Sequence, residues 1–447
     1  MTPLPQAAAG HVTNAQPGGT NLGAVTGQDG GWRGRWQDGL RYGGLGLPLA
    51  FVALPLYVLL PNHYATEFGV PLATLGALLL GARLLDAVAD PWIGAWADRG
   101  FARSTRYVLK WAALAALLLA LGFRGLFFPA VQGPQALLWW CGALLALTYL
   151  SYSVLSVLHQ AWGARLGGDA AQRSRIVAWR EGLALLGVLV ASVLPSLAGL
   201  GVATTVFALA LAVGLVLLTR APRARQLPAA APLSWRAPLA SPAFRRLLVV
   251  YLANGIASAV PATLVLFFIR DRLDAAAFEP LFLASYFAAG ALAMPLWVRA
   301  VARWGLAPPW LAGMALAVLA FVWAAALGPG DVAAYTAVCL ASGVALGADL
   351  ALPGALLAGV IQRNGHGGRL EGAYFGWWNF ATKLNLALAA GVALPLLAWA
   401  GYTPGSRDAV ALQALSNAYC LLPIALKLLA ATLLWWFWLR RPEENTA

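Results

Sequence analysis

Residues 81–99 read GARLLDAVADPWIGAWADR and lie between long apolar runs, so they belong to a membrane-spanning helix. The stretch nevertheless carries Arg83, Asp86 and Asp90. Spacings of three and four residues place these side chains on one helical face. Because ionisable groups are costly at bilayer depth, this face is expected to line a bundle interior or a water-filled cavity. The pattern predicts an ion or substrate site; the alternative is that Arg83 neutralises the acids only to hold two helices together.

The composition of the whole chain is that of a polytopic membrane protein. Of its 447 residues, 61% are hydrophobic and only 11% are charged, a balance that soluble domains do not have. The net charge of +13 does not indicate nucleic-acid binding, because the basic residues cluster in short segments between apolar runs. We expect the lipid bilayer and a small-molecule substrate as partners, and we predict a monomer that binds no nucleic acid.

The remaining chemistry-bearing residues form no catalytic or metal-binding pattern. Cys141, Cys339 and Cys420 lie far apart inside apolar runs, and four His argue against a zinc or haem centre. No Walker sequence is present, so ATP is not the expected energy source. We therefore predict that the protein is not an enzyme and has no cofactor and no metal site.

Apolar runs long enough to cross about 30 Å of hydrocarbon recur about twelve times along the chain. The expected spans are 42–60, 72–97, 107–127, 136–160, 176–197, 202–220, 247–269, 279–301, 309–328, 332–361, 371–400 and 413–439. Pro48 and Pro55 are expected to kink the first span. The expected organisation is a disordered cytoplasmic tail (1–40), a six-helix half (41–220), a central cytoplasmic loop (221–245), a second six-helix half (246–441) and a tail (442–447).

The distribution of basic residues predicts the orientation of the chain. Arg and Lys gather after the even-numbered spans, as at Arg99 and Arg103, whereas the opposite loops are almost bare. Such residues mark the cytoplasmic side. We therefore predict that both termini are cytoplasmic and that the protein lies in a bacterial inner membrane.

The two halves contain an internal repeat. A Pro followed eight residues later by an Arg occurs at 91–99 and again at 295–303, each at the end of the second span of its half. The positions aligned with the two acids hold Gly290 and Met294. Two similar halves fit a parallel-repeat transporter architecture. The acids are not required by that architecture, which favours a functional role for them.

The run R-x-x-D-A-x-x-D-P-x-x-G at 83–94 resembles the second helix of the glycoside–pentoside–hexuronide:cation symporters. This family is a branch of the major facilitator superfamily and is typified by the melibiose carrier. The resemblance implies an all-α fold of about twelve transmembrane helices in two halves, and it implies that Asp86 and Asp90 form the cation-coupling site. The sodium-using melibiose carrier has an Asn before the second Asp. This chain has Ala89 there, which favours H⁺ over Na⁺ as the coupling ion.

The resemblance extends to other candidate substrate-binding residues. The family has a cavity-facing Arg at the position of Arg180, although a helix-end Arg that reaches the interface is the alternative. Near the end of the fourth span, where the melibiose carrier uses an Asp for sugar, this chain has His159 and Trp162. Trp162 is a candidate for stacking on a sugar face or for an interfacial position. The missing acid leaves the sugar specificity open.

The eleventh span also resembles the family, in which an acid–Gly–aromatic run precedes a helix with one Lys. That lysine corresponds to Lys383, which lies well inside an apolar span and needs a carboxylate partner such as Asp86 or Asp90. Nearby turns offer stacking and hydrogen-bonding groups for a substrate, with helix packing as the alternative. The candidate substrate-binding residues of this span are Lys383, Tyr374, Trp378 and Asn379. Arg83 of the second span is a further candidate for substrate binding.

A last group of residues is expected to gate the protein or to support its structure. These residues are Pro91, Gly94, Asp98, Arg99, Asp349 and Glu371. Pro91 removes a backbone donor beside the acids, and Asp349 is a further acid inside a span. Lys427 in the last span has no evident partner, and we expect it to reach the interface.

Together these patterns predict secondary transport by alternating access, with H⁺- or Na⁺-coupled symport of a sugar or glycoside. The first alternative is a carrier or exporter of lipid or amphiphilic compounds. The second alternative is a transport-inactive sensor or scaffold, against which Asp86, Asp90 and Lys383 argue.

Overall fold

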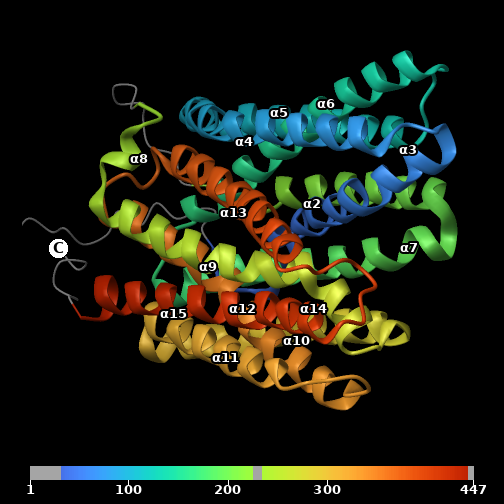
Figure 1. Cartoon of the computed structure of the whole chain (residues 1–447). Helices are drawn as coiled ribbons and strands as arrows, with labels where there is room; N and C mark the ends of the chain where they lie inside the picture. The colour runs from blue at the N-terminus through green and yellow to red at the C-terminus, as the bar shows by residue number, and fades with distance from the viewer. Residues whose placement is uncertain (1–31, 225–233, 441–447) are drawn as a thin grey trace, which may run out of the picture.

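The computed structural model describes residues 32–224 and 234–440, and the regular elements in these ranges are all helical. In Figure 1 the blue-to-green helices of the first half are stacked on the yellow-to-red helices of the second half. The halves meet mainly where α4 (Leu72–Arg103) packs on α13 (Glu371–Trp399) and where α7 (Ala170–Thr219) packs on α10 (Glu279–Trp304). The predicted arrangement in two halves is therefore present.

The other helices of the first half are α1 (Trp36–Gly43), α2 (Gly46–Phe51), the π-helical η1 (Pro55–Leu59), α3 (Leu60–Phe68), α5 (Thr105–Phe127) and α6 (Pro134–Arg165). The second half begins with α8 (Ala237–Ala240), α9 (Pro242–Phe267), η2 (Phe268–Arg272) and η3 (Ala276–Phe278). It continues with α11 (Ala307–Ala325), α12 (Val332–Arg363), α14 (Ala409–Ser416), η4 (Asn417–Leu421), α15 (Leu422–Leu434) and η5 (Trp435–Leu439).

Within residues 32–224 and 234–440, nine helical segments are long and apolar enough to cross a membrane by length and composition. One of them, α7, has 50 residues and would be about 75 Å long if straight, far more than one crossing needs. It contains two crossings joined at Gly199, where φ is +82° and glycine is favoured. With α4 and the divided first span, the layout reaches the twelve crossings that the sequence predicts.

The start of the chain differs from the prediction. Residues 1–31 of the expected disordered tail lie outside the described residues, but α1 makes the last part of that tail helical. Asp38 of α1 is buried and accepts a hydrogen bond from Arg33 N at 3.1 Å, and α1 packs on α7. The apolar content of 32–40 is too low to predict this docking. The central 225–233 and the terminal 441–447 also lie outside the described residues.

The first span is interrupted, as its two prolines predict. It is divided into α2, the π-helical η1 that begins at Pro55, and α3. Because proline has no N–H to donate, the regular hydrogen-bond ladder cannot run through this position. Large apolar side chains remain exposed on the outer faces of the bundle, as at Leu197 and Leu292, each 80% exposed. Such a surface fits contact with lipid.

Candidate functional site

Lys383 of α13 joins the two acids of α4. Its Nζ lies 2.6 Å from Asp86 Oδ2 and 2.8 Å from Asp90 Oδ2. Ser153 of α6 accepts a hydrogen bond from Lys383 Nζ at 2.7 Å and donates one to Asp86 Oδ1 at 2.5 Å. We call these four residues the Lys383 cluster. Since α4 and α6 belong to the first half and α13 to the second, the predicted pairing of Lys383 across the two halves is confirmed.

The two acids of the Lys383 cluster differ in how well their oxygens are satisfied. Asp86 accepts a hydrogen bond from Ser153, whereas neither oxygen of the fully buried Asp90 accepts one within the described part of the chain. Lys383 Nζ is close enough to Asp90 for an ion pair but not aligned for a hydrogen bond. A buried carboxylate without hydrogen bonds is costly. One ammonium thus faces two carboxylates, and Asp90 is the less stabilised of the two.

Arg83 and Arg180 were both predicted at the substrate site. Arg83 is half-buried one turn before Asp86 and interacts with it electrostatically. Arg180 pairs with Glu181, whose Oε1 accepts hydrogen bonds from Arg180 Nε at 2.9 Å and from a terminal guanidinium nitrogen at 2.5 Å. The Arg180 guanidinium lies near Gly354 of α12, so it is placed at the boundary between the halves. A substrate role for either arginine stays a prediction.

Three candidates from the eleventh span lie on α13 with Lys383. Asn379 donates a hydrogen bond to Ser156 Oγ of α6 at 3.4 Å, and the ring of Trp378 stacks on Tyr251 at a centroid distance of 3.7 Å. Asn379 is four residues from Lys383 and on the same face of α13, whereas Trp378 is five residues away and faces α9. Tyr374 is farther along the helix and fully buried, and its hydroxyl bonds to residues near the beginning of α13. The structure thus brings Asn379 close to the Lys383 cluster, whereas Trp378 and Tyr374 make their contacts elsewhere.

His159 and Trp162 of α6 have partners within the first half. His159 Nε2 lies 2.7 Å from the backbone oxygen of Tyr42, and the two rings are in contact. Trp162 Nε1 donates to the backbone oxygen of Pro222 at 2.9 Å. Both side chains are buried; the bond of Trp162 uses its only donor, whereas His159 Nδ1 has no hydrogen-bond partner among the described residues. Substrate binding by these two residues stays a prediction without geometric support.

Close glycine contacts allow α4 and α13 to approach each other beside the Lys383 cluster. A Cβ added at Gly94 would lie 2.2 Å from the backbone oxygen of Gly372, and one at Gly372 would lie 2.3 Å from that of Gly94. A Cβ at Gly376 would lie 2.5 Å from the backbone oxygen of Asp90 and 3.0 Å from Pro91 Cα. No side chain fits at these positions, so Gly94 has the structural role that the sequence predicts.

We expect Gly372→Ala to move α4 and α13 apart. The new Cβ would overlap backbone that cannot rotate away, and it would also lie 2.9 Å from Asp98 Oδ1. Distances between spin labels on the two helices should increase and broaden relative to the unsubstituted protein. Gly391→Ala is the matched control, because a Cβ at that position of α13 meets nothing within 4 Å. Identical distance distributions for both variants would contradict the assignment of a tight crossing.

A second inter-half network lies where α4 and α6 end and α13 begins, which we call the Asp98 end. Asp98 accepts hydrogen bonds from the backbone N–H groups of Gly372 at 2.7 Å and Ala373 at 2.8 Å, and from Arg165 at 2.6 Å. Arg165 also lies 3.1 Å from Glu371 Oε2. All three charged groups are buried. A carboxylate is favoured beside the free N–H groups at a helix N-terminus.

The Asp98 network includes two predicted gating residues and one that the sequence interpretation missed. Asp98 and Glu371 were both expected, whereas Arg165 was not among the predicted residues. Arg99, which was predicted with them, is exposed and takes no part in the network. Arg165 has no distinctive local signal, because an arginine at the end of a span is also the ordinary mark of orientation.

The prediction that Lys427 reaches the membrane interface is wrong. Lys427 of α15 is buried, forms an ion pair with Asp349 of α12, and donates to Asn254 Oδ1 at 2.7 Å and Ser258 Oγ at 3.1 Å. Asp349 also accepts hydrogen bonds from Asn254, Ser258 and Trp310 Nε1. The network lies entirely in the second half. Its charges are paired and its donors used, so Asp349 is placed to hold four helices together, consistent with the structural role expected for it.

Comparison with known proteins agrees with this architecture. Residues 40–441 match the family model described as MFS/sugar transport protein. Two proteins of Escherichia coli K12 are similar to part of the chain. The inner membrane symporter YicJ is 31% identical over 135 residues, and YagG, proposed to be a glycoside/cation symporter, is 29% identical over 159 residues. These matches cover 29% and 35% of this chain but only 28% and 34% of the relatives.

Solved structures of transporters share the fold. A bacterial homologue of the iron transporter ferroportin superposes with a TM-score of 0.67 at 16% identity, over 90% of this chain and 98% of that one. The proton:xylose symporter XylE gives a TM-score of 0.63 at 14% identity, over 90% and 95% of the two chains. The predicted all-α major facilitator fold of a multi-pass membrane protein is thereby confirmed. The matched family comprises transport proteins and not enzymes, and this chain belongs to the MFS/sugar transport protein family.

Proposed function

We propose that the protein is a secondary transporter that couples the movement of a sugar or glycoside to that of a cation. The observation that carries the proposal is the Lys383 cluster, in which two buried carboxylates share one ammonium across the two halves. The family match and the name of YagG, a proposed glycoside/cation symporter, support a sugar or glycoside as substrate, and YicJ supports symport. Asn379, which bonds to Ser156 of α6, offers a hydrogen-bonding group beside the cluster.

Cation coupling follows from the charges of the Lys383 cluster. A proton or cation that reaches Asp90 neutralises a carboxylate with no hydrogen bond of its own, and it weakens the attraction of Asp90 for Lys383. Because that attraction links α4 to α13, binding of the cation is tied to the contact between the halves. A substrate near Lys383 acts on the same contact. This common element gives alternating access a physical basis.

We further propose that the Asp98 end faces the cytoplasm of a bacterial inner membrane, with both termini on that side. The predominance of Arg at this end supports the orientation. With Asp98, Arg165 and Glu371 in contact, the two halves are closed against each other at this end. The arrangement corresponds to a conformation in which access, when open, is from the opposite side.

We expect a proton gradient and not sodium to drive uptake. The side-chain oxygens at the cluster come from Asp86, Asp90 and Ser153, and Ala89 adds none. A hard cation such as Na⁺ needs several oxygen ligands, whereas a proton needs one carboxylate. Purified protein in liposomes should accumulate labelled glycoside when the pH gradient is imposed without Na⁺. Accumulation should collapse on addition of a protonophore. Strict dependence on Na⁺ would instead point to a metal site that Ser153 helps to complete.

One observation favours the lipid alternative as a second candidate. A groove of about 470 Å³ lies between α7 and α10 at the boundary of the halves, lined by apolar side chains such as Leu186 and Leu292, with Arg175 among them. An apolar groove with a cation fits a lipid chain and its headgroup. Transfer of labelled lipid between leaflets by the same liposomes, without glycoside uptake, would support this candidate over sugar transport.

A further inference from the structure

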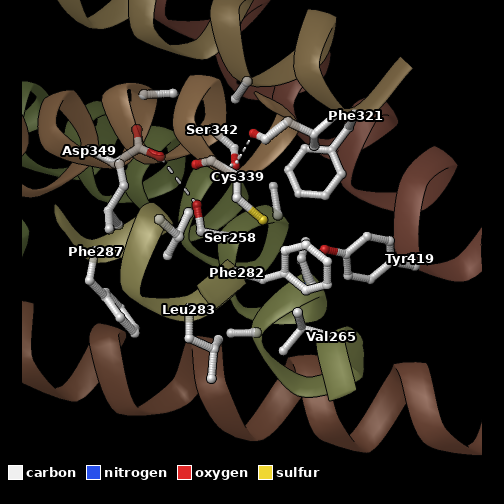
Figure 2. A pocket seen from close by; sticks show the side chains of 18 of the residues that line it. Ser258, Val265, Phe282, Leu283, Phe287, Phe321, Cys339, Ser342, Asp349 and Tyr419 are labelled. Atoms are coloured by element: carbon white, nitrogen blue, oxygen red, sulfur yellow. Dashed lines mark hydrogen bonds between the residues drawn. The ribbon is translucent and has the colours of Figure 1, made fainter. Parts of the chain in front are cut away.

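The second half contains a cavity of about 160 Å³ that is separate from the Lys383 cluster, none of whose residues line it. Figure 2 shows Asp349 and Ser258 on one side of it and the rings of Phe282, Phe321 and Tyr419 on the other. The walls come from α9, α10, α11, α12, η4 and α15. The cavity therefore belongs to one half of the protein and does not lie on the boundary at which the halves separate.

The charged groups beside this cavity are already paired with each other. Lys427 donates hydrogen bonds to Asn254, Ser258 and Asp349. All three N–H donors of the Lys427 ammonium group are thus used. Asp349 accepts hydrogen bonds on both oxygens. The pair is neutral as a whole, so it does not attract a further ion. A ligand of this cavity is accordingly expected to be uncharged.

Aromatic side chains from four elements line part of the remaining wall, among aliphatic and small side chains. Tyr335 and Tyr419 bond to each other through their hydroxyl groups at 2.7 Å. Tyr286 differs from them: its side chain lines the cavity and is half-buried, and its hydroxyl takes part in no hydrogen bond among the described residues. Phenolic hydroxyls in protein interiors usually have a partner. The unused hydroxyl of Tyr286, beside the aromatic part of the wall, is a group to which a ligand in the cavity can bond.

The size of the cavity limits its occupant to about one ring. An engineered apolar cavity of about 150 Å³ in another protein binds benzene. We propose that this cavity is a binding site for a small neutral molecule of the phenol class, that is, one aromatic ring bearing a hydroxyl group. The ring packs against the aromatic walls, and its hydroxyl bonds to that of Tyr286. This proposal concerns a second site and does not depend on sugar transport by the Lys383 cluster.

The test measures the binding of three probes to purified, full-length protein in detergent. Phenol carries the ring and the hydroxyl, toluene has the ring alone, and 1-hexanol has a hydroxyl on a flexible chain. A ligand of the native state raises the Tm with a concentration dependence that gives an apparent Kd. We expect phenol to bind roughly tenfold more tightly than toluene, as one added hydrogen bond allows, and 1-hexanol to bind most weakly.

Two variants locate the effect. Ser342→Phe should fill the cavity and abolish the response to phenol, while removing only hydroxyl bonds to carbonyl groups of its own helix. Its matched control is Ser192→Phe on the exposed side of α7, where the serine likewise bonds to its own helix.

Tyr286→Phe should retain toluene binding and reduce the preference for phenol to near unity. Tyr64→Phe, which removes from the core of the first half a hydroxyl with no hydrogen bond among the described residues, should leave that preference unchanged.

Several results would overturn the proposal. An equal response of the unsubstituted protein and Ser342→Phe would show that the probes act through the detergent. Equal binding of 1-hexanol and phenol would identify a cavity for aliphatic chains. If Ser342→Phe does not fold, the comparison of Tyr286→Phe with Tyr64→Phe decides the matter, and an unchanged preference in Tyr286→Phe refutes the proposed contact. The proposed transport function can fail in its own assay without changing any of these results.

Discussion

Lys383→Ala is expected to cost about 3–5 kcal/mol of stability and to abolish coupled transport. The substitution leaves Asp86 and Asp90 buried beside each other without the ammonium that now lies within 2.8 Å of both. It also removes the contribution of the second half to the cluster. Thermal unfolding of the purified protein measures the first effect, and gradient-driven uptake per folded molecule measures the second.

A double substitution separates an interacting pair from two independent residues. Lys383→Ala combined with Asp90→Ala should recover part of the lost stability, because one of the two unpaired carboxylates is removed while Asp86 remains, but it should not recover transport. Lys427→Ala is the matched control: it also leaves a carboxylate unpaired, at Asp349, but within one half. It should lower stability while the folded fraction still couples. Full stability of Lys383→Ala, with no gain in the double variant, would exclude the interaction.

Asp90→Asn is expected to abolish accumulation of substrate against its gradient. The amide has almost the same shape as the carboxylate but carries no charge, so it cannot be neutralised by a proton or a cation. Insertion and folding should be retained, because no hydrogen bond to the Asp90 oxygens is lost. Uptake into liposomes under an imposed gradient measures accumulation, and exchange of labelled for unlabelled substrate without a gradient measures the carrier itself.

The expected pattern for Asp90→Asn is loss of accumulation with retention of exchange. Asp349→Asn provides the comparison, since it changes an intramembrane acid outside the Lys383 cluster. Normalised to folded protein, this control should still accumulate substrate. Accumulation by Asp90→Asn at the level of the unsubstituted protein would remove Asp90 from the coupling site.

The Lys383 cluster could be predicted from the sequence because its members are conspicuous. An unpaired carboxylate or ammonium group inside an apolar span has a high free energy, so Asp86, Asp90 and Lys383 were expected to meet. The sequence offered few other charged residues inside spans that could pair with Lys383. Hydropathy and span length similarly predicted the twelve crossings. Ser153 gave a weaker signal, since serine is common in membrane helices and only its neighbours distinguish it.

What could not be predicted depends on contacts between helices far apart in the chain. Lys427 meets Asn254 and Asp349, which lie 173 and 78 residues away, and no local pattern connects them. His159 and Trp162 were candidate substrate ligands because of their place near the end of the fourth span. Their partners are backbone oxygens, which every residue carries, so no sequence pattern could reveal them. Residue type shows that a polar group needs a partner, but only the packing shows which partner it has.

The N-terminal turn of α13 takes its cap from the opposite half of the protein. No side chain at Leu370, the local cap position, bonds to the helix, and Asp98 accepts the hydrogen bonds of Gly372 and Ala373 instead. When this end opens, those N–H groups lose their acceptor and must be hydrated. Opening therefore requires the entry of water as well as the separation of helices, and the hydration of one helical turn becomes part of the energy barrier of the cycle.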